Sequence, residues 1–426
     1  MIQKNYPKVL VLANNAFSTT DANGRTLGNF FINWPKGCLA QFALQAQNID
    51  TNICNNYFII PDGQALHSFK TGISAKNSYY KISTSASALS KNKKIKKSPF
   101  TMLLRDLVWE SKRWRGEEFN KWVEEFSPDI ILLQAGDSPF MYDLALLLAK
   151  ERKLPLIIYN SECYYFKNFC YLTNTLSNWL YPLFHFIFKR AFKKAMQYTS
   201  GVIYITKALE DLHQNTFKHN SITLMTSSSM HKESHIMNLS QNPQIVYLGN
   251  LGLKRYKNLI KIAKEIQKIN PAWKVTVYGK ASEQAEKEMR NCSAIELKGF
   301  VSYDAVVKIQ QSADLLLHTE YEDDFYIKDL QYAFSTKIAD CLSAGVPFLV
   351  YAPKSFSFID YLSSNNAAFV VTAEKDLVQV LKQALLDETK RKKQVENALK
   401  LACKNHDIAQ NAQYFEQFIK GIYEER

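Results

Sequence analysis

Short apolar runs alternate with stretches of helical periodicity along the chain, and this alternation occurs twice. Runs such as KVLVLA (8–13), DIILLQ (129–134) and QIVYLG (244–249) lack the polar–apolar alternation of a half-exposed strand. Such runs are typical of strands buried on both faces, as in parallel sheets that are flanked by helices. The pattern predicts an α/β fold with two Rossmann-like, doubly wound domains that face a cleft.

The first half contains predicted helices over 28–47 and 139–152 and predicted strands at 8–13, 129–134, 155–160, 201–206 and 222–226. In the second half the pattern predicts strands at 244–249, 273–279, 294–299, 314–318, 347–352 and 367–371. The helices expected there span 257–269, 283–290, 302–311, 335–343 and the chain from 375 onward.

A polar segment without periodicity, 230–243, separates the two halves and is interpreted as a linker. The expected domains are an N-terminal Rossmann-like domain, 1–235, and a C-terminal Rossmann-like domain, 236–407. The last helix, about 408–426, is expected to pack back on the first domain.

The composition is that of a globular protein, with 46% hydrophobic and 22% charged residues among 426. Seven scattered cysteines without a C-x-x-C pair fit a reducing cytoplasm. The apolar run at the N-terminus is too short for a signal peptide, and the longest apolar segment, 176–188, is too short to span a membrane. We therefore expect a cytoplasmic protein, with peripheral attachment to the inner face of the membrane as an open alternative.

The net charge of +13 is concentrated in 70–122, where thirteen Lys and Arg face four Asp and Glu. Such a region attracts a phospholipid, a phosphate-bearing substrate or a nucleic acid, although an ordinary solvated face has the same composition. No stacking platform or reading helix accompanies the charge, so no nucleic acid is expected.

Apolar residues recur at helical spacing between 176 and 188, and cations follow them. This is the composition of a helix that lies on an anionic membrane, and also of a helix buried against its own sheet. The lysines of 91–97 and the cluster of Trp109, Trp114 and their basic neighbours add to the membrane reading. The helix residues are Leu176, Trp179, Leu180, Leu183, Phe184, Ile187, Phe188, Lys189, Arg190, Lys193 and Lys194.

A glycine-rich loop, GNLGLKRYKN (249–258), follows the strand at 244–249 and opens a helix. Glycine lets the backbone approach a ligand closely, and a helix N-terminus offers N–H groups to an anion. Lys254, Arg255 and Lys257 add positive charge, which suits a phosphate. The candidate donor-binding residues of the loop are Gly249, Asn250, Leu251, Lys254 and Lys257.

The second motif is STKIADCLSAGVP (335–347), in which Ser335 or Thr336 is expected to cap a helix. Lys337 lies in the first turn, where the helix dipole disfavours a cation unless an anion is bound. Asp340 follows one turn later and can accept hydrogen bonds from ribose hydroxyls.

The order of these motifs resembles glycosyltransferases of the GT-B fold, in particular the retaining enzymes of family four. The resemblance covers about 244–371 and includes Ser-Thr-Lys-Ile-x-Asp-x-Leu-x-x-Gly-x-Pro. It implies that the C-terminal domain binds a nucleotide-sugar donor, a UDP- or GDP-sugar, and that the N-terminal domain binds the acceptor. In such a site Lys254 or Lys257 and Lys337 bind the diphosphate, and Asp340 binds the ribose. Asn250 stands where the family often has Arg or Lys, and Asp340 replaces its second glutamate.

In the first half the resemblance extends only to the layout. Gly24, Arg25 and Thr26 follow the first strand, where such enzymes contact donor phosphate and acceptor. Asp137 and Glu162 each follow a strand and are the candidate catalytic carboxylates, which orient an acceptor hydroxyl or stabilise positive charge on the sugar. A helix cap or a salt-bridge partner is the alternative role for either.

No metal and no cofactor are expected: Glu322, Asp323 and Asp324 lack a supporting histidine and are read as a solvated loop. His318, at a strand end, is a candidate donor contact or a core histidine. The predicted function is transfer of a sugar to a glycan or lipid-linked acceptor. A nucleotide-sugar epimerase of the same fold and a non-catalytic nucleotide-sugar-binding protein are the alternatives.

Overall fold

A computed structural model describes residues 6–79, 97–168, 176–230, 233–234 and 239–425. The chain divides into two compact units. Unit 1 contains residues 1–225 and 409–426, and unit 2 contains residues 226–408. Within the described part of the chain, no helix has the length and apolar character that crossing a membrane requires.

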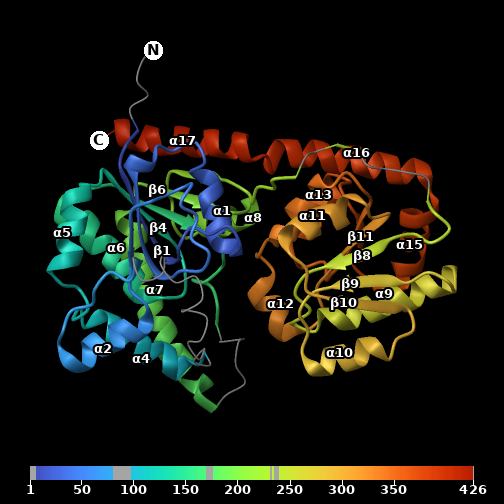
Figure 1. Ribbon diagram of the computed structural model, residues 1–426, viewed down its shortest axis with the longest axis horizontal. Coiled ribbons are helices and arrows are strands. Elements are labelled where there is room, and N and C mark those ends of the chain that lie inside the picture. The colour runs from blue at the N-terminus through green and yellow to red at the C-terminus, as the bar shows by residue number, and fades with distance from the viewer. Residues whose placement is uncertain (1–5, 80–96, 169–175, 231–232, 235–238, 426) are drawn as a thin grey trace. The chain divides into compact units, whose positions relative to one another are not determined.

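Unit 1 is built on a seven-stranded sheet in the order β3-β2-β1-β4-β5-β6-β7, with every strand pair parallel (Figure 1). Its strands are β1 (Val9–Asn15), β2 (Leu39–Gln45), β3 (Tyr57–Ile59), β4 (Ile130–Gln134), β5 (Leu156–Asn160), β6 (Gly201–Tyr204) and β7 (Ser221–Thr223). Its helices are α1 (Ala22–Phe30), η1 (Lys36–Cys38), α2 (Asp62–Thr71), α4 (Pro99–Glu110), α5 (Glu117–Phe126), α6 (Pro139–Arg152), η2 (Leu176–Leu180), α7 (Tyr181–Tyr198), α8 (Lys207–Gln214) and α17 (Ile408–Glu424).

The helix predicted over 28–47 is wrong, because α1 ends at Phe30 and a strand, β2, occupies the second half of that range. Pro35 and Gly37 interrupt the segment between them, as helix-breaking residues do. Gln41 contributed to the error, because a polar residue within an apolar run is not expected in a strand that is buried on both faces. In the structure this side chain is fully buried. It accepts a hydrogen bond from the Phe17 amide at 2.8 Å and donates to the Asn15 carbonyl at 3.3 Å.

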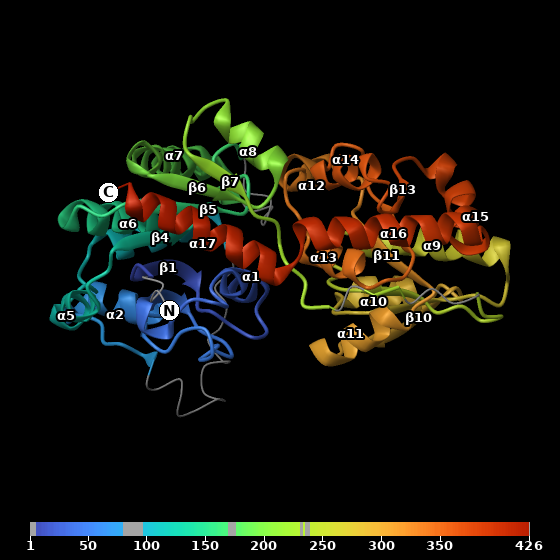
Figure 2. The ribbon, with the colours of Figure 1, turned by 90° about the horizontal axis from the view of Figure 1, so that it is seen from above.

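The C-terminal helix α17 belongs to unit 1 and lies beside α1 (Figure 2). Phe415 stacks on Phe30 with ring centroids 5.4 Å apart and meets Phe31 edge to face at 4.8 Å. These side chains are buried in a core that also contains residues of β1, β4 and β5. Burial of several large aromatic side chains fixes the end of the chain on the first sheet.

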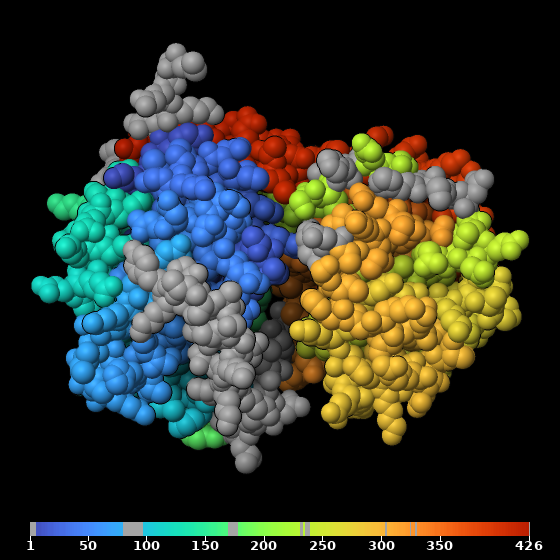
Figure 3. Space-filling model, in the orientation of Figure 1, coloured from blue at the N-terminus to red at the C-terminus, as the bar shows by residue number. Residues whose placement is uncertain are grey.

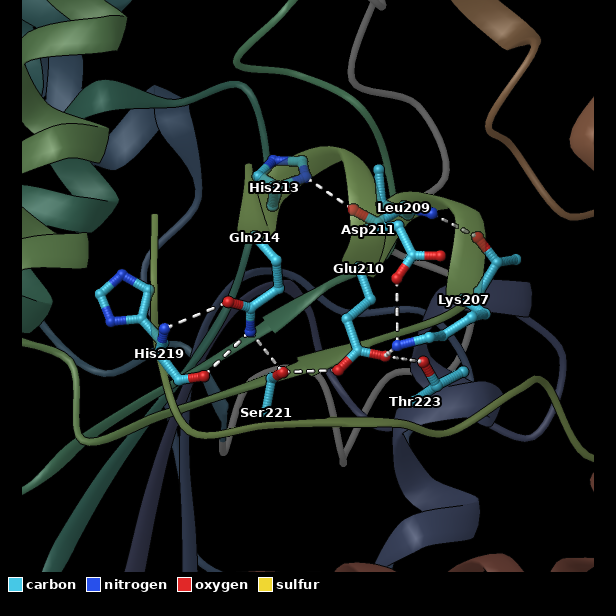
Figure 4. Close-up of polar contacts among 10 residues, drawn as sticks. Lys207, Leu209, Glu210, Asp211, His213, Gln214, His219, Ser221 and Thr223 are labelled. Atoms are coloured by element: carbon cyan, nitrogen blue, oxygen red, sulfur yellow. Dashed lines mark hydrogen bonds and ion pairs between the residues drawn. The ribbon is translucent and has the colours of Figure 1, made fainter. Parts of the chain in front are cut away.

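The edge of the sheet at β7 is held by a polar network from α8 (Figure 4). Glu210 accepts hydrogen bonds from the hydroxyls of Ser221 at 2.5 Å and Thr223 at 2.7 Å, and from the Lys207 ammonium at 3.0 Å. Burial raises the pKa of Glu210, but these three donors outweigh it and lower the pKa overall. The sequence pattern did not predict α8.

Unit 2 contains a six-stranded parallel sheet in the order β10-β9-β8-β11-β12-β13. Its strands are β8 (Ile245–Leu248), β9 (Val275–Tyr278), β10 (Ile295–Gly299), β11 (Leu315–Thr319), β12 (Phe348–Tyr351) and β13 (Phe369–Val371). Its helices are α9 (Arg255–Ile269), α10 (Glu283–Arg290), α11 (Tyr303–Gln311), α12 (Asp324–Leu330), α13 (Thr336–Ser343), α14 (Ser357–Ser364), η3 (Glu374–Asp376), α15 (Leu377–Leu386) and α16 (Glu388–Asn405).

All six strands predicted for the second half are present, each within a few residues of its expected bounds. The apolar residues of these strands are buried against α9, α10 and α15 in one core. The two parallel sheets with flanking helices confirm the predicted α/β fold. Of the predicted linker, 230–243, residues 231–232 and 235–238 lie outside the described residues, and the units meet at 225/226 rather than 235/236.

Candidate functional site

In each sheet the strand order reverses at one point, and open α/β sheets bind ligands outside the carboxyl ends of the strands there. In unit 2 the reversal lies between β8 and β11, and in unit 1 it lies between β1 and β4. The predicted site residues of unit 2 come from the loop that follows β8, the first turn of α9, the end of β11 and the start of α13. They therefore gather at one edge of their sheet.

Gly249 and Lys337, 88 positions apart in the sequence, are in direct contact in unit 2. A Cβ atom at position 249 would lie 2.1 Å from Lys337 Nζ, so the absence of a side chain makes room for the lysine. Gly249 also has φ +151°, which favours glycine. Its carbonyl oxygen in turn would clash with any side chain at Gly279.

The Lys337 ammonium is buried and has no hydrogen-bond partner among the described residues. It lies 5.3 Å from the centre of the Tyr247 ring. Burial, together with the nearby Arg255, lowers the pKa of Lys337 to about 8, against the opposing effect of Glu320. A buried cation without a partner is costly, and an anion would relieve that cost. The expected phosphate-binding role of Lys337 remains a prediction that this geometry favours.

Arg255 and Glu320 form a buried ion pair beside Lys337. Arg255 Nε lies 2.8 Å from Glu320 Oε2, and their side chains are 15% and 6% exposed. Glu320 Oε1 lies 3.6 Å from His318 Nε2. His318 is buried, and burial, with Lys337 and Arg255, holds its pKa well below the ordinary value, so the ring is neutral at physiological pH.

Neither Arg255 nor Glu320 was among the predicted site residues. Arg255 was visible as one of three cations in the loop, but sequence alone does not show which cation turns inward. Glu320 follows the strand that ends at Thr319, and a carboxylate directly after a buried strand was the available signal.

The remaining residues of the glycine-rich loop differ in exposure. Leu251 is buried in the core, which argues against a side-chain contact with a donor. Asn250 Oδ1 accepts a hydrogen bond from the Gly252 amide at 2.8 Å, so this side chain shapes its own loop. Lys254 Nζ pairs with Asp323 Oδ2 at 2.6 Å, and Lys257 Nζ lies 5.6 Å from the centre of the Tyr321 ring. Both lysines are close to acidic or aromatic partners from the segment after β11.

The start of α13 carries the other predicted donor residues. Ser335 is the N-cap residue by position, but its side chain makes no capping hydrogen bond within the described structure, and Thr336 is the first helical residue. Asp340 is buried and accepts a hydrogen bond from the Ser228 hydroxyl at 2.7 Å. A ribose contact by Asp340 would therefore add to an existing bond.

In unit 1, Asp137 follows β4 and forms an ion pair with Lys97. Burial raises the pKa of Asp137, but Lys97, with Arg105 and Lys167, outweighs that effect and lowers the pKa overall. At the adjacent Gly136 a Cβ atom would lie 2.5 Å from Asn14 Nδ2, so a side chain there would require Asn14 to move. Asp137 is thus an ionised carboxylate next to the point of strand reversal.

Glu162 follows β5, the strand next to β4, and its side chain is 39% exposed. Its Oε2 lies 3.7 Å from Lys167 Nζ, and the Lys167 ammonium also acts on Asp137. One lysine therefore links the two candidate carboxylates electrostatically.

Of the predicted residues Gly24, Arg25 and Thr26, the first and last lie within the packed start of α1. Gly24 lies in the first turn of α1, where a Cβ atom would lie 2.3 Å from the Ala16 carbonyl oxygen. Its amide donates to Asp21 Oδ2 at 2.9 Å. Thr26 is buried and Arg25 is half-buried. Only Arg25 retains substantial exposure for a ligand contact.

Comparison with known proteins bears on both units. Residues 231–401 match the family model for Glycosyl transferases group 1. HepE of Anabaena, in complex with UDP and glucose, superimposes with a TM-score of 0.60 at 12% identity over 97% of this chain and 100% of that chain. Sucrose-phosphate synthase from Thermosynechococcus elongatus gives 0.62 at 10% identity, with 98% and 100% covered. WaaG, a glycosyltransferase involved in lipopolysaccharide biosynthesis, gives 0.59 at 15%, with 97% and 100% covered.

The comparison with curated proteins gives no match. At identities this low, the solved structures establish the fold alone. The family model matches the part of the chain that contains most of unit 2. The predicted resemblance to GT-B glycosyltransferases of the family-four group is confirmed. The whole chain has the GT-B fold of these solved structures, and its residues 231–401 resemble the group 1 glycosyl transferases.

Proposed function

We propose that the enzyme transfers a sugar from a UDP- or GDP-sugar to a glycan or lipid-linked acceptor, with retention of anomeric configuration and without a metal ion or cofactor. The observation that carries the proposal is the buried Lys337 ammonium, which lies against Gly249 at the strand reversal of unit 2 and has no hydrogen-bond partner among the described residues. HepE is described in complex with UDP and glucose, which supports a nucleotide-sugar donor here.

In this proposal Lys337 binds the donor diphosphate. Breaking the bond between the sugar and the diphosphate develops negative charge on the leaving phosphate, and a fixed cation in a site without water stabilises that charge. The N–H groups at the start of α13 act in the same direction. Lys254 and Lys257 supply more exposed positive charge from the loop after β8.

The catalytic carboxylate is Asp137 or Glu162. Each carboxylate lies after a strand of the first sheet and near Lys167. An ionised carboxylate there orients the acceptor hydroxyl or stabilises positive charge on the sugar ring in the transition state. The low pKa of Asp137 favours the electrostatic role over proton uptake.

A panel of nucleotides and nucleotide sugars, tested for thermal stabilisation, examines the donor half of the proposal. A ligand that binds the native state raises the unfolding midpoint by mass action. We expect a uridine or guanosine diphosphate to raise it and adenosine nucleotides to have less effect. The absence of any shift across the panel would contradict nucleotide-sugar binding.

Product analysis of the stabilising nucleotide sugar separates the three functions. Transfer or slow hydrolysis of the sugar supports a transferase. Conversion to an epimeric nucleotide sugar without acceptor identifies an epimerase, and stabilisation without any turnover identifies a binding protein. We place the enzyme in the cytoplasm, at the inner face of the membrane when its acceptor is lipid-linked.

A further inference from the structure

Large apolar side chains are exposed in one region of unit 1. Among the described residues twelve such side chains are exposed, and six of them lie on α4 and on η2–α7, with exposed fractions between 47% and 76%. Single exposed apolar residues are normal on a protein surface, whereas a cluster marks an interface. The six are Phe100, Leu104, Leu107, Trp179, Leu183 and Phe186.

The elements that carry these residues are neighbours, because α4 contacts both η2 and α7. The two helices are at the lower edge of unit 1 in Figure 1, and α4 reaches the surface there in Figure 3. On each helix the exposed residues recur at i, i+4 and i+7, which keeps them on one side. We call this surface the α4–α7 face.

The face differs from the one that the sequence predicted. Phe184 and Phe188 were expected on it but are buried, and Trp109 and Trp114 are buried as well. Phe186 and the three α4 residues were not expected. Lysines 91–96 lie outside the described residues.

Positive charge adjoins the apolar part of the face. Along α7 the exposed side continues from Phe186 to Arg190, Lys193 and Lys194, and the helix contains no acidic residue. The C-terminal end of α4 leads to the exposed Lys112 and Arg113. Lys112 and Lys194 both act electrostatically on Glu110, so the cationic ends of the two helices lie together.

We propose that the α4–α7 face binds the surface of an anionic membrane. Aromatic and aliphatic side chains suit the boundary between headgroups and acyl chains, and cations beside them suit lipid phosphate. Charge complementarity selects this occupant, because a purely apolar partner leaves the basic half of the face unused. Membrane binding would bring a lipid-linked acceptor close to unit 1, and this purpose rests on the proposed function.

Co-sedimentation of the full chain with phosphatidylcholine vesicles, with and without phosphatidylglycerol, tests the proposal. We expect binding only with phosphatidylglycerol and a decrease as salt is raised. The pair Trp179→Ser with Phe186→Ser is expected to weaken binding about tenfold or more. The triple change of Arg190, Lys193 and Lys194 to Gln is expected to weaken it by a similar factor.

Matched controls come from unit 2. Phe300→Ser with Leu386→Ser removes apolar side chains that are 72% and 57% exposed, and Lys392→Gln with Lys393→Gln removes exposed cations of α16. These variants are expected to bind vesicles as the wild type does. Far-ultraviolet circular dichroism and the nucleotide-induced thermal shift verify that every variant is folded.

Equal binding to both kinds of vesicle, no binding to either, or wild-type binding by the α4–α7 variants would overturn the proposal. So would a dimer in sedimentation velocity that Trp179→Ser with Phe186→Ser dissociates, because a second copy would then occupy the face. Vesicle binding is measured without donor, so its failure is distinguishable from failure of the transferase proposal. If nucleotides did not raise the unfolding midpoint of the wild type, only the transferase proposal would be contradicted.

Discussion

The candidate sites of the two units balance charge in opposite ways. In unit 2 the Lys337 ammonium is buried and lacks a hydrogen-bond partner among the described residues, while Arg255 and Glu320 satisfy each other nearby. In unit 1 each candidate carboxylate already has a cation, since Asp137 pairs with Lys97 and Glu162 lies near Lys167. One site holds unsatisfied charge, and the other holds paired charge.

This difference suggests separate tasks for the two units: unit 2 would bind the anionic donor, and unit 1 would orient the acceptor. An unsatisfied buried cation destabilises the free protein and makes anion binding more favourable, because the anion removes the penalty. A paired carboxylate on the surface of unit 1 binds nothing strongly by itself, but the cation beside it restrains its position. We therefore expect changes in unit 2 to affect donor affinity and changes in unit 1 to affect turnover.

The largest effect is expected for Lys337→Met. Removing the cation that meets the leaving diphosphate should lower turnover by roughly 10²–10³-fold and abolish most of the nucleotide-induced thermal shift. Steady-state kinetics at limiting donor measures the first effect. Lys261→Met is the control, because Lys261 is an α9 lysine that pairs with Glu374 at 2.6 Å. Equal kinetics in the two variants would contradict the role of Lys337.

The same substitution should stabilise the ligand-free protein. The pKa of Lys337 is lowered to about 8 in the folded state, below its ordinary 10.5, so the charged form is disfavoured in the folded protein. This destabilisation is complete below pH about 8 and disappears as the pH rises through the unfolded pKa. At neutral pH, Lys337→Met should raise the free energy of unfolding by roughly 1–3 kcal/mol. Denaturant unfolding that shows destabilisation instead would argue against an unpartnered cation.

In unit 1, Asp137→Asn and Glu162→Gln distinguish the two candidate carboxylates. Substitution of the catalytic carboxylate should reduce the rate of sugar transfer by about 10²-fold while leaving donor affinity within a few-fold of wild type. The other should have little effect on either, like the control Glu151→Gln, which alters an exposed acid paired with Arg115. Transfer at wild-type rates in both variants would remove the carboxylates from the mechanism.

The pH dependence of donor affinity gives a smaller effect. Above pH about 8 the ligand-free Lys337 loses its proton, and anion binding must restore it. The dissociation constant for a nucleotide sugar should therefore rise by up to about tenfold per pH unit above that value. Calorimetric titrations across this range measure the slope. Lys337→Met should show a flat profile, and a steep profile in that variant would assign the titration to another group.

The smallest effect is expected for Lys254→Ala. Lys254 pairs with Asp323, but its side chain is 44% exposed, and such pairs contribute about 0–1 kcal/mol to stability. Donor affinity should fall only a few-fold, and the fall should shrink at high salt because the charge is screened. A loss as large as that of Lys337→Met would show that the exposed loop, rather than the buried lysine, holds the phosphate.

The sequence by itself determined the strands of unit 2 and the motifs between them. The apolar runs of β8, β11 and β12 are buried on both faces, so the local pattern is sufficient to predict these strands. The glycine after β8 and the helix at Thr336 were also visible, because a strand end, a glycine and a helix start are local features.

Only the tertiary structure decided what depends on residues far apart in the chain. Gly249 and Lys337 meet because β8 and β11 are neighbours at the strand reversal, and the space that Gly249 leaves is what lets the lysine reach its place. Likewise Gln41 is a strand residue because Phe17 and Asn15 satisfy its amide. On α7, which residues face solvent was settled by packing against α6 and α4, since helical periodicity alone does not fix which apolar side is covered.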